Sequence, residues 1–186
     1  MTELATQTWT YEAYLALPED GNRYEIIEGE LYVTPPPIEG HQYSSGELFF
    51  AMFSFIRAHR LGILYHPPFE VHLSATTRPV QPDLTFIRTE NKPTFSMNYF
   101  EGVPDLVVEI FSPSTHRIDQ TIKYDAYQKA GVAEYWMVDP LARTVWVYTL
   151  HEGVYTLHGQ FVANDTITSK VLVGLEILNS TLFDSP

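Results

Sequence analysis

The sequence predicts an α/β protein with a sheet flanked by helices, and three segments carry this prediction. Residues 104–140 combine a buried strand, a helix and a second buried strand, which is typical of a parallel, right-handed crossover unit. Residues 41–61 form the longest predicted helix, and residues 63–87 contain two strands that precede the crossover unit. The chain order is therefore helix, three strands, helix, strand.

Length and composition favour one domain without a membrane segment. The 186 residues are enough to bury roughly 70% of the unfolded surface, and we expect a single domain over residues 1–186. The absence of cysteine excludes disulfides and cysteine zinc sites. The N-terminus lacks the features of a signal peptide, and no apolar run reaches the roughly 20 residues of a membrane span. A soluble, cytoplasmic protein is expected.

The net charge of −12 limits the ways in which this chain can bind nucleic acid. Neutralisation of phosphates by Lys and Arg supplies most non-specific affinity, so bulk electrostatic attraction is disfavoured. A local basic rim or a bound metal ion can offset the repulsion at one cleft. Nucleic-acid binding therefore requires such a local site.

The first half of the chain supplies a short helix, a hairpin, the long helix and two strands. In order, these are residues 9–17 with Thr10 as the N-cap, 23–33 turning at Glu28-Gly29, 41–61, 63–73 and 80–87. Gly62 is expected to end the long helix. Asp83 follows Pro82 at the head of the last strand, and residues 88–104 are predicted to form a loop.

The crossover unit contains a carboxylate in an apolar setting. Leu106 to Phe111 is apolar at every position except Glu109, and such a run predicts a strand covered on both faces. An unpaired carboxylate there would cost several kcal/mol. Glu109 must therefore be protonated, paired with a cation or bound to a metal ion.

The helix after this strand supplies a possible cation. Its apolar residues recur at four-residue spacing, and they are Ile118, Ile122, Ala126 and Ala130. Gly131 is expected to end the helix. Asp119, Lys123 and Tyr127 form a second stripe beside the apolar one, so Lys123 can reach over the core edge toward the preceding strand.

The remainder of the chain is predicted to be rich in β-structure. Residues 134–138 form the second buried strand of the crossover unit, and residues 143–149 form a strand that turns back after Asp139-Pro140. Two short strands are expected near residues 154–157 and 169–173.

Asp83, Glu109 and Lys123 are the strongest candidates for catalytic residues. Two carboxylates on neighbouring strands could hold Mg²⁺ or Mn²⁺, which prefer oxygen ligands. A nearby lysine could orient or deprotonate an attacking water and stabilise charge on a phosphorane-like transition state. The reaction expected from this combination is phosphodiester hydrolysis.

Each of the three residues also has a purely structural interpretation. Aspartate after proline commonly begins or caps an element. Glu109 could pair with a buried arginine, and Lys123 could form a surface ion pair with Asp119 worth only roughly 0.3–0.5 kcal/mol. Spacing alone leaves both interpretations open.

Five blocks of the sequence resemble, in order and spacing, the Uma-type "putative restriction endonuclease" family. That family lies within the PD-(D/E)XK (restriction endonuclease-like) nuclease superfamily. The blocks are YEIIEGELYVTPPP, HQYSSGEL, QPDLTFI, PDLVVEIFSPSTHRIDQTIKYDAYQKAGVAEYWMVDP and TVWVY. They extend from Tyr24 to Tyr148 and therefore cover most of the chain.

The resemblance implies a restriction endonuclease-like core, in which a central mixed β-sheet is flanked by helices, with an N-terminal hairpin and a β-rich C-terminal tail. The acidic motifs of the superfamily match Pro82-Asp83 and Glu109, so binding of Mg²⁺ or Mn²⁺ is implied for these two acids. The superfamily pattern places lysine two residues after the second acid, where this chain has Phe111. In similar proteins the lysine lies on the following helix, which matches Lys123.

Other positions also match the family. His41 could contact substrate or water, or could simply be a histidine at a helix end. Glu47 could be the acid that many superfamily members carry on their first helix, although it lies on a different helix face from His41. The role of Glu25 is open. The remaining matches are expected to be structural, and they are Asp119, Tyr127, Glu134 and Trp136.

The sequence therefore predicts a metal-dependent endonuclease that acts on DNA, with His41 as an additional candidate catalytic residue. A homodimer is expected, because related endonucleases cut two strands with two active sites. The alternative is a catalytically inactive nuclease fold that serves as a binding or regulatory module. The acidic net charge and Phe111 favour this alternative, whereas the presence of Asp83, Glu109 and Lys123 together opposes it.

Overall fold

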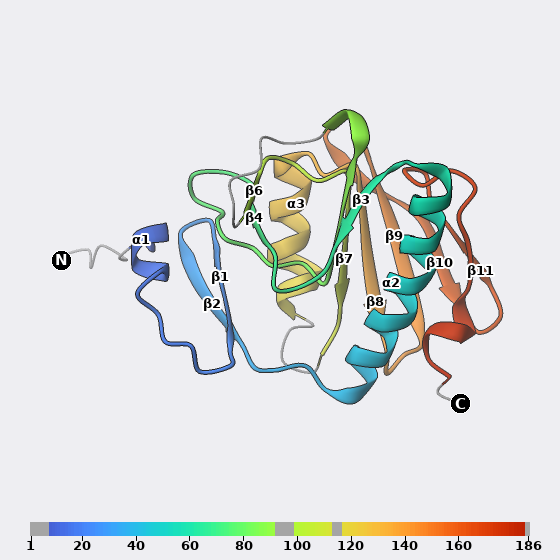
Figure 1. Cartoon of the computed structure of the whole chain (residues 1–186), viewed down its shortest axis with the longest axis horizontal. Helices are drawn as coiled ribbons and strands as arrows, with labels where there is room; N and C mark the ends of the chain where they lie inside the picture. Colours follow the sequence, from blue (N-terminus) through green and yellow to red (C-terminus); the bar gives the residue numbers. More distant parts are fainter. Residues whose placement is uncertain (1–7, 92–98, 113–116, 185–186) are drawn as a thin grey trace.

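The computed structural model describes residues 8–91, 99–112 and 117–184, and a six-stranded mixed sheet forms its centre (Figure 1). Across the sheet, the strands are β10 (Val154–Val162), β9 (Thr144–His151), β8 (Glu134–Asp139), β7 (Leu106–Ile110), β5 (Leu84–Arg88) and β3 (Gly62–Tyr65). Strands β7 and β8 are parallel, and their other neighbours are antiparallel. The parallel pairing of the predicted crossover unit and the order helix, three strands, helix, strand are confirmed.

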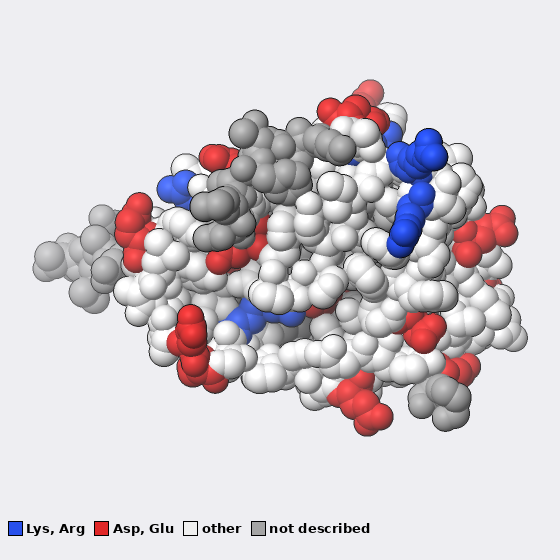
Figure 2. All heavy atoms as spheres, viewed as in Figure 1, with Lys and Arg blue, Asp and Glu red and all other residues white. Residues whose placement is uncertain are grey.

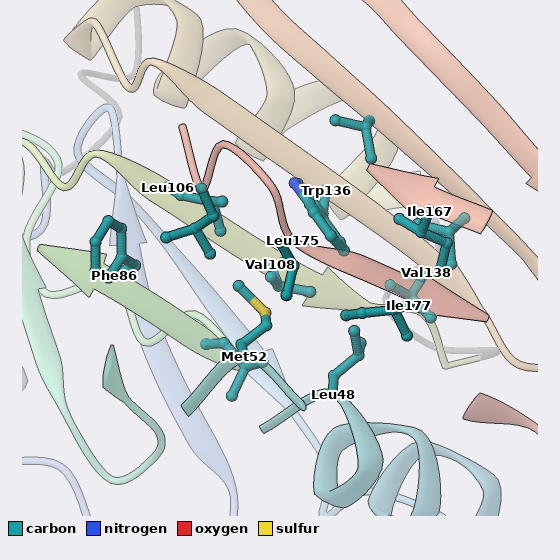
Figure 3. Close-up of a cluster of buried hydrophobic side chains, with 14 of the residues drawn as sticks. Leu48, Met52, Phe86, Leu106, Val108, Trp136, Val138, Ile167, Leu175 and Ile177 are labelled. Carbon is teal, nitrogen blue, oxygen red and sulfur yellow. The ribbon is translucent and has the colours of Figure 1, made fainter. Parts of the chain in front are cut away.

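Helices cover both faces of the sheet. Helix α2 (Glu39–His59) packs on one face through Leu48, Met52 and Ile56, where they meet apolar side chains of the central strands (Figure 3). Helix α3 (Tyr124–Ala130) lies on the opposite face, where Ala126 and Tyr127 are buried (Figure 1). None of the helices in the described ranges has the length and apolar character of a membrane span.

Three small two-stranded sheets surround the central one. They are the hairpin of β1 (Arg23–Ile27) and β2 (Glu30–Thr34), the parallel pair of β4 (Glu70–His72) and β6 (Tyr99–Glu101), and the pair of β11 (Thr166–Thr168) and β12 (Glu176–Leu178). The hairpin turns through Glu28 and Gly29, both with positive φ, as the sequence predicts. It places its buried residues over the α3 side of the sheet, because Ile27 belongs to that cluster.

Several predicted boundaries are wrong for identifiable reasons. Helix α1 (Tyr11–Tyr14) is capped by Thr10 as expected but makes only one turn. Helix α2 ends at Arg60, which adopts the left-handed conformation. Gly62 instead begins β3, where a side chain would collide with the carbonyl oxygen of Ile87.

The strand expected over residues 63–73 is divided in two. Pro67 and Pro68 interrupt it, so that β3 stays in the central sheet and β4 pairs with β6 instead. The strand expected over 80–87 begins only at Leu84, since Val80 makes a single bridge with Val71.

Two further predictions fail in irregular regions. Strand β6 lies inside the segment 88–104 that was predicted to be a loop, and residues 92–98 of that segment lie outside the described part. The strand expected near 169–173 is absent from the described tail, which pairs through β11 and β12 instead.

The helix after β7 differs from its prediction in which stripe is buried. A π-helical segment (Ile118–Lys123) precedes α3, and Gly131 ends α3 as expected. Ile118 and Ile122 are only partly buried, whereas Asp119, Lys123 and Tyr127 are buried. The polar stripe therefore faces the sheet, and it places ionisable side chains where an apolar stripe would only pack.

Glu134 anchors the C-terminal tail to the central sheet. Its fully buried carboxylate accepts hydrogen bonds from the Trp136 indole and the Ser169 hydroxyl at 2.7 and 2.6 Å. It also accepts from the backbone amides of Lys170 and Val171 at 2.6 and 3.1 Å. Four donors meet at one carboxylate, so the expected structural role of Glu134 and Trp136 has a clear physical basis.

Replacement of Glu134 should destabilise the fold strongly. Glu134→Ala leaves several buried donors without an acceptor, and each such donor costs about 1–3 kcal/mol. We expect the free energy of unfolding in urea to fall by at least about 3 kcal/mol, with a smaller loss for Glu134→Gln. Glu176→Ala, at an exposed acid of the same tail, should change it little. Equal stabilities for Glu134→Ala and Glu176→Ala would contradict this role.

Candidate active site

The ammonium group of Lys123 lies at the centre of a buried acidic cluster. Its Nζ is 2.9 Å from Glu109 Oε1, 2.9 Å from Glu25 Oε2 and 3.7 Å from Asp119 Oδ1. The Tyr127 hydroxyl donates a further hydrogen bond of 2.6 Å to Glu109 Oε1. Lys123 is 3% exposed, so its pairing with Asp119 is not the surface ion pair that the structural interpretation described. The helix, β7 and the hairpin all meet at this lysine.

Asp83 forms the second half of the cluster. Its Oδ1 is 3.0 Å from Arg23 Nη1, and its Oδ2 is 3.0 Å from His41 Nε2 and accepts a 2.8 Å hydrogen bond from the Ile110 amide. The antiparallel register pairs Leu84 with Val108, which brings Asp83 beside Glu109. The proximity of the two acids thus follows from strand pairing.

A cavity of about 20 Å³ lies between these groups, enough for a water molecule or a small ion. Its charged lining consists of the carboxylates of Glu25, Asp83, Glu109 and Asp119 and the cations of Arg23 and Lys123. The lining therefore holds four acidic side chains against two basic ones, Arg23 and Lys123. The cavity is therefore electrostatically suited to another cation.

Burial raises the pKa of Glu109 well above its ordinary value, and the carboxylates of Asp119, Asp83 and Glu25 act in the same direction against the ammonium of Lys123. Burial alone would lower the pKa of Lys123, but Glu109, Glu25 and Asp119 together raise it. Lys123 consequently stays protonated and acts as a positive charge. Its resting state does not suit it to be a general base.

Burial would also raise the pKa of Asp83, but the hydrogen bond from His41 and the guanidinium of Arg23 outweigh it and lower the pKa to about 2. Asp83 is therefore ionised at neutral pH. The other ring nitrogen of His41, Nδ1, is buried and has no hydrogen-bond partner in the described ranges. It is left available to a water molecule or a substrate group.

The donor set fits a hard divalent cation in its chemistry. Asp83 and Glu109 offer carboxylate oxygens, the ligands that Mg²⁺ and Mn²⁺ prefer, beside the cavity. Among the described residues, no three histidine, aspartate or glutamate side chains form a preassembled metal-binding group. The acid oxygens instead contact the intramolecular cations, and a carboxylate retains acceptor capacity beyond such contacts.

The structure brings together all four residues that the sequence singled out, Asp83, Glu109, Lys123 and His41. Glu47 does not join them, because it lines a separate surface hollow with Tyr43 and Asp184. The site also contains Glu25, whose role was open, and Arg23, which no sequence pattern singled out.

A weak signal for Glu25 and Arg23 is present in the sequence. Residues two apart on a strand share one face, so a cation and an acid at these positions project together from the hairpin. Asp119, which was expected to be structural, lines the cavity, and its backbone carbonyl accepts a hydrogen bond of 3.0 Å from the Tyr135 hydroxyl.

The fold and the paired acids define a nuclease-like α/β protein, and comparisons with known proteins specify the family. Residues 11–181 match the family model of Uma2, described as "Putative restriction endonuclease". The chain belongs to the Uma2 family. No curated protein matches it. A solved structure described as "a putative nuclease belonging to DUF820" from Anabaena variabilis superposes with a TM-score of 0.77 at 21% identity, covering 94% of this chain and 97% of that one. This similarity supports the fold.

The low pKa of Asp83 predicts a specific loss of stability in acid. The folded pKa of about 2 lies below the unfolded value near 3.9, so ionised Asp83 stabilises the fold above about pH 4, by roughly 2–3 kcal/mol. This stabilisation is lost as the pH falls from about 4 to about 2. Urea unfolding in EDTA should show a flatter pH dependence for Asp83→Asn than for the wild type over this interval. Parallel curves would contradict the low pKa.

Proposed function

We propose that this protein is a metal-dependent endonuclease that hydrolyses phosphodiester bonds, with DNA as the substrate. The observation that carries the proposal is the Lys123 ammonium, held between Glu109 and Glu25 at the edge of an ion-sized cavity that Asp83 also lines. Membership of the family described as "Putative restriction endonuclease" supports the same class of reaction. Mg²⁺ or Mn²⁺ is the proposed cofactor, with Asp83 and Glu109 as its ligands.

The proposed role of each residue in the site follows from its charge and its contacts. Phosphodiester hydrolysis develops negative charge on the phosphoryl oxygens, and the protonated Lys123 can stabilise it. Arg23, which contacts Asp83 and lines the open cleft beside it, can hold a neighbouring phosphate. His41 can orient the attacking water through Nδ1 while Asp83 fixes the opposite side of its ring. When bound, the metal ion supplies further positive charge and acidifies a water molecule.

Removal of either proposed metal ligand should abolish cleavage. We expect Asp83→Ala and Glu109→Ala to eliminate Mg²⁺-dependent nicking of plasmid DNA at low salt, because each removes carboxylate oxygens from the cavity. Glu47→Gln is the matched control, since Glu47 is an acid of α2 outside the site, and it should retain wild-type activity. Circular dichroism establishes that each variant is folded. Undiminished cleavage by Glu109→Ala would refute the assignment.

Lys123→Met should separate charge stabilisation from metal binding. The variant removes the ammonium but keeps an unbranched apolar side chain, so the cavity gains net negative charge. We expect the cleavage rate to fall by roughly 100-fold or more, in line with loss of one charge-stabilising group. Mn²⁺ affinity by isothermal titration calorimetry should stay equal or increase. Weaker Mn²⁺ binding together with an unchanged rate would show that Lys123 has a different role.

Complete absence of cleavage by folded wild-type protein would favour the non-catalytic binding module. The observation that favours a binding module is that both oxygens of Asp83 already contact donors of the protein itself. Mn²⁺ calorimetry distinguishes the two functions, because only the nuclease requires a divalent cation at the acidic cluster. The single domain and the homodimer stay predictions, and sedimentation analysis is the direct measurement of the latter.

A further inference from the structure

A cleft of about 300 Å³ opens beside the acidic cluster. Arg23, Pro37, His41 and Asp83 line both this cleft and the smaller cavity, so the two spaces are adjacent. Figure 2 shows the molecular surface hollowed between the hairpin and α2, with a basic side chain in the floor of the hollow. The cleft is therefore an approach to the proposed catalytic groups from solvent.

Aromatic rings form the wall of the cleft on the α2 side. The Phe49 ring lies 5.0 Å from His66 in an edge-to-face arrangement and 5.3 Å from Phe53 in a stacked one. Phe53 is 38% exposed, and the Arg57 guanidinium lies 6.0 Å from the centre of its ring. A row of rings thus extends from the cleft along α2 and ends at a cation. Figure 2 shows basic side chains gathered over the C-terminal half of α2.

Gly46 provides a second, independent observation at the same wall. It lies inside α2, where glycine disfavours the helix relative to alanine. A Cβ atom at this position would meet no atom within 4 Å beyond the helix's own neighbouring backbone, so packing does not require glycine here. Because Gly46 lines the cleft, its missing side chain keeps the space beside the Phe49 ring open.

These features fit one class of ligand. Accessible rings, here the partly buried Phe49 and the exposed Phe53, can stack on nucleobases without reading their sequence, and a cation at the end of the row attracts phosphate. Asp83 and Glu109 are each 2% exposed, so a flexible strand entering the cleft can approach them more closely than a stiff duplex. We propose that the cleft and the Phe49–Phe53 face bind single-stranded nucleic acid, with bases on the rings and the backbone toward Arg23. The inference rests on the proposed nuclease function and adds to it a preference for unpaired over duplex strands.

Fluorescence anisotropy with a labelled oligothymidylate of about 15 nucleotides tests this binding. Ca²⁺ replaces Mg²⁺, because it takes the same oxygen ligands with a less strict geometry, so binding is measured apart from cleavage. The wild type should bind the single strand more tightly than a duplex of equal length. Phe49→Leu preserves apolar packing but removes the ring, and should weaken binding roughly 5- to 150-fold. Phe50→Leu is the matched control, because Phe50 is 70% exposed on the same helix but outside the cleft lining, and should bind normally.

Gly46→Leu provides a variant whose stability and binding should change in opposite directions. Leucine favours the helix, so the thermal midpoint should rise by roughly 2–4 °C. The same side chain occupies the cleft and should weaken oligonucleotide binding. A higher midpoint with unchanged binding would overturn the proposed site.

The remaining outcomes distinguish this inference from the function on which it rests. Duplex binding as tight as that of the single strand, unaffected by Phe49→Leu, would overturn the inference and leave the nuclease proposal intact. Binding of neither nucleic acid would overturn both. A dimer in sedimentation that Phe49→Leu dissociates, with oligonucleotide binding unchanged, would assign this face to a second copy of the chain.

Discussion

The buried contact between Lys123 and its two glutamates is the interaction on which the site depends. Glu109 belongs to the centre of the sheet, Glu25 to a hairpin and Lys123 to the crossover helix, so one ammonium connects three separate parts of the chain. Burying these ions costs desolvation free energy, and their mutual attraction offsets this cost only while all partners are in place. The same lysine that holds the hairpin against the sheet is also the positive charge on which the proposed phosphodiester hydrolysis relies. Stability and proposed catalysis share one contact.

The sheet gives this contact its position. Antiparallel pairing of β5 with β7 places Asp83 beside Glu109, while the parallel crossover brings the helix back over β7. The polar stripe of that helix is buried, and its first turns are π-helical, a departure often found at functional sites. The chain forms a less common helix with a charged interface at this position. An apolar stripe would stabilise the fold without the desolvation penalty of buried charges. The excess of acidic over basic side chains in the cavity is the feature that suits this cluster to the proposed divalent cation.

Sequence patterns identified the parts of this architecture that depend on local periodicity. The apolar run around Glu109, the helix stop at Gly131 and the turn at Glu28-Gly29 all follow from neighbouring residues. The contribution of Glu25 could not be predicted in this way, because its contact with Lys123 joins residues far apart in the chain and depends on how the hairpin lies over the sheet. Because Pro67 and Pro68 interrupt the strand, β4 pairs with β6 in a different sheet. Such pairing depends on tertiary structure, which the alternation of side chains does not reveal.

The position of Phe111 explains how the site can lack lysine on its strand and still present one to Glu109. Residues two apart on a strand share a face, so Phe111 lies on the same side as Glu109, where it is buried in the apolar cluster beneath α3. A lysine at 111 would place its charged group in that cluster. The helix instead delivers Lys123 to the same carboxylate at 2.9 Å, from a register in which Asp119 and Tyr127 flank it. The cation is thus preserved by geometry although the strand motif is incomplete, and the presence of Phe111 is not by itself an argument for an inactive fold.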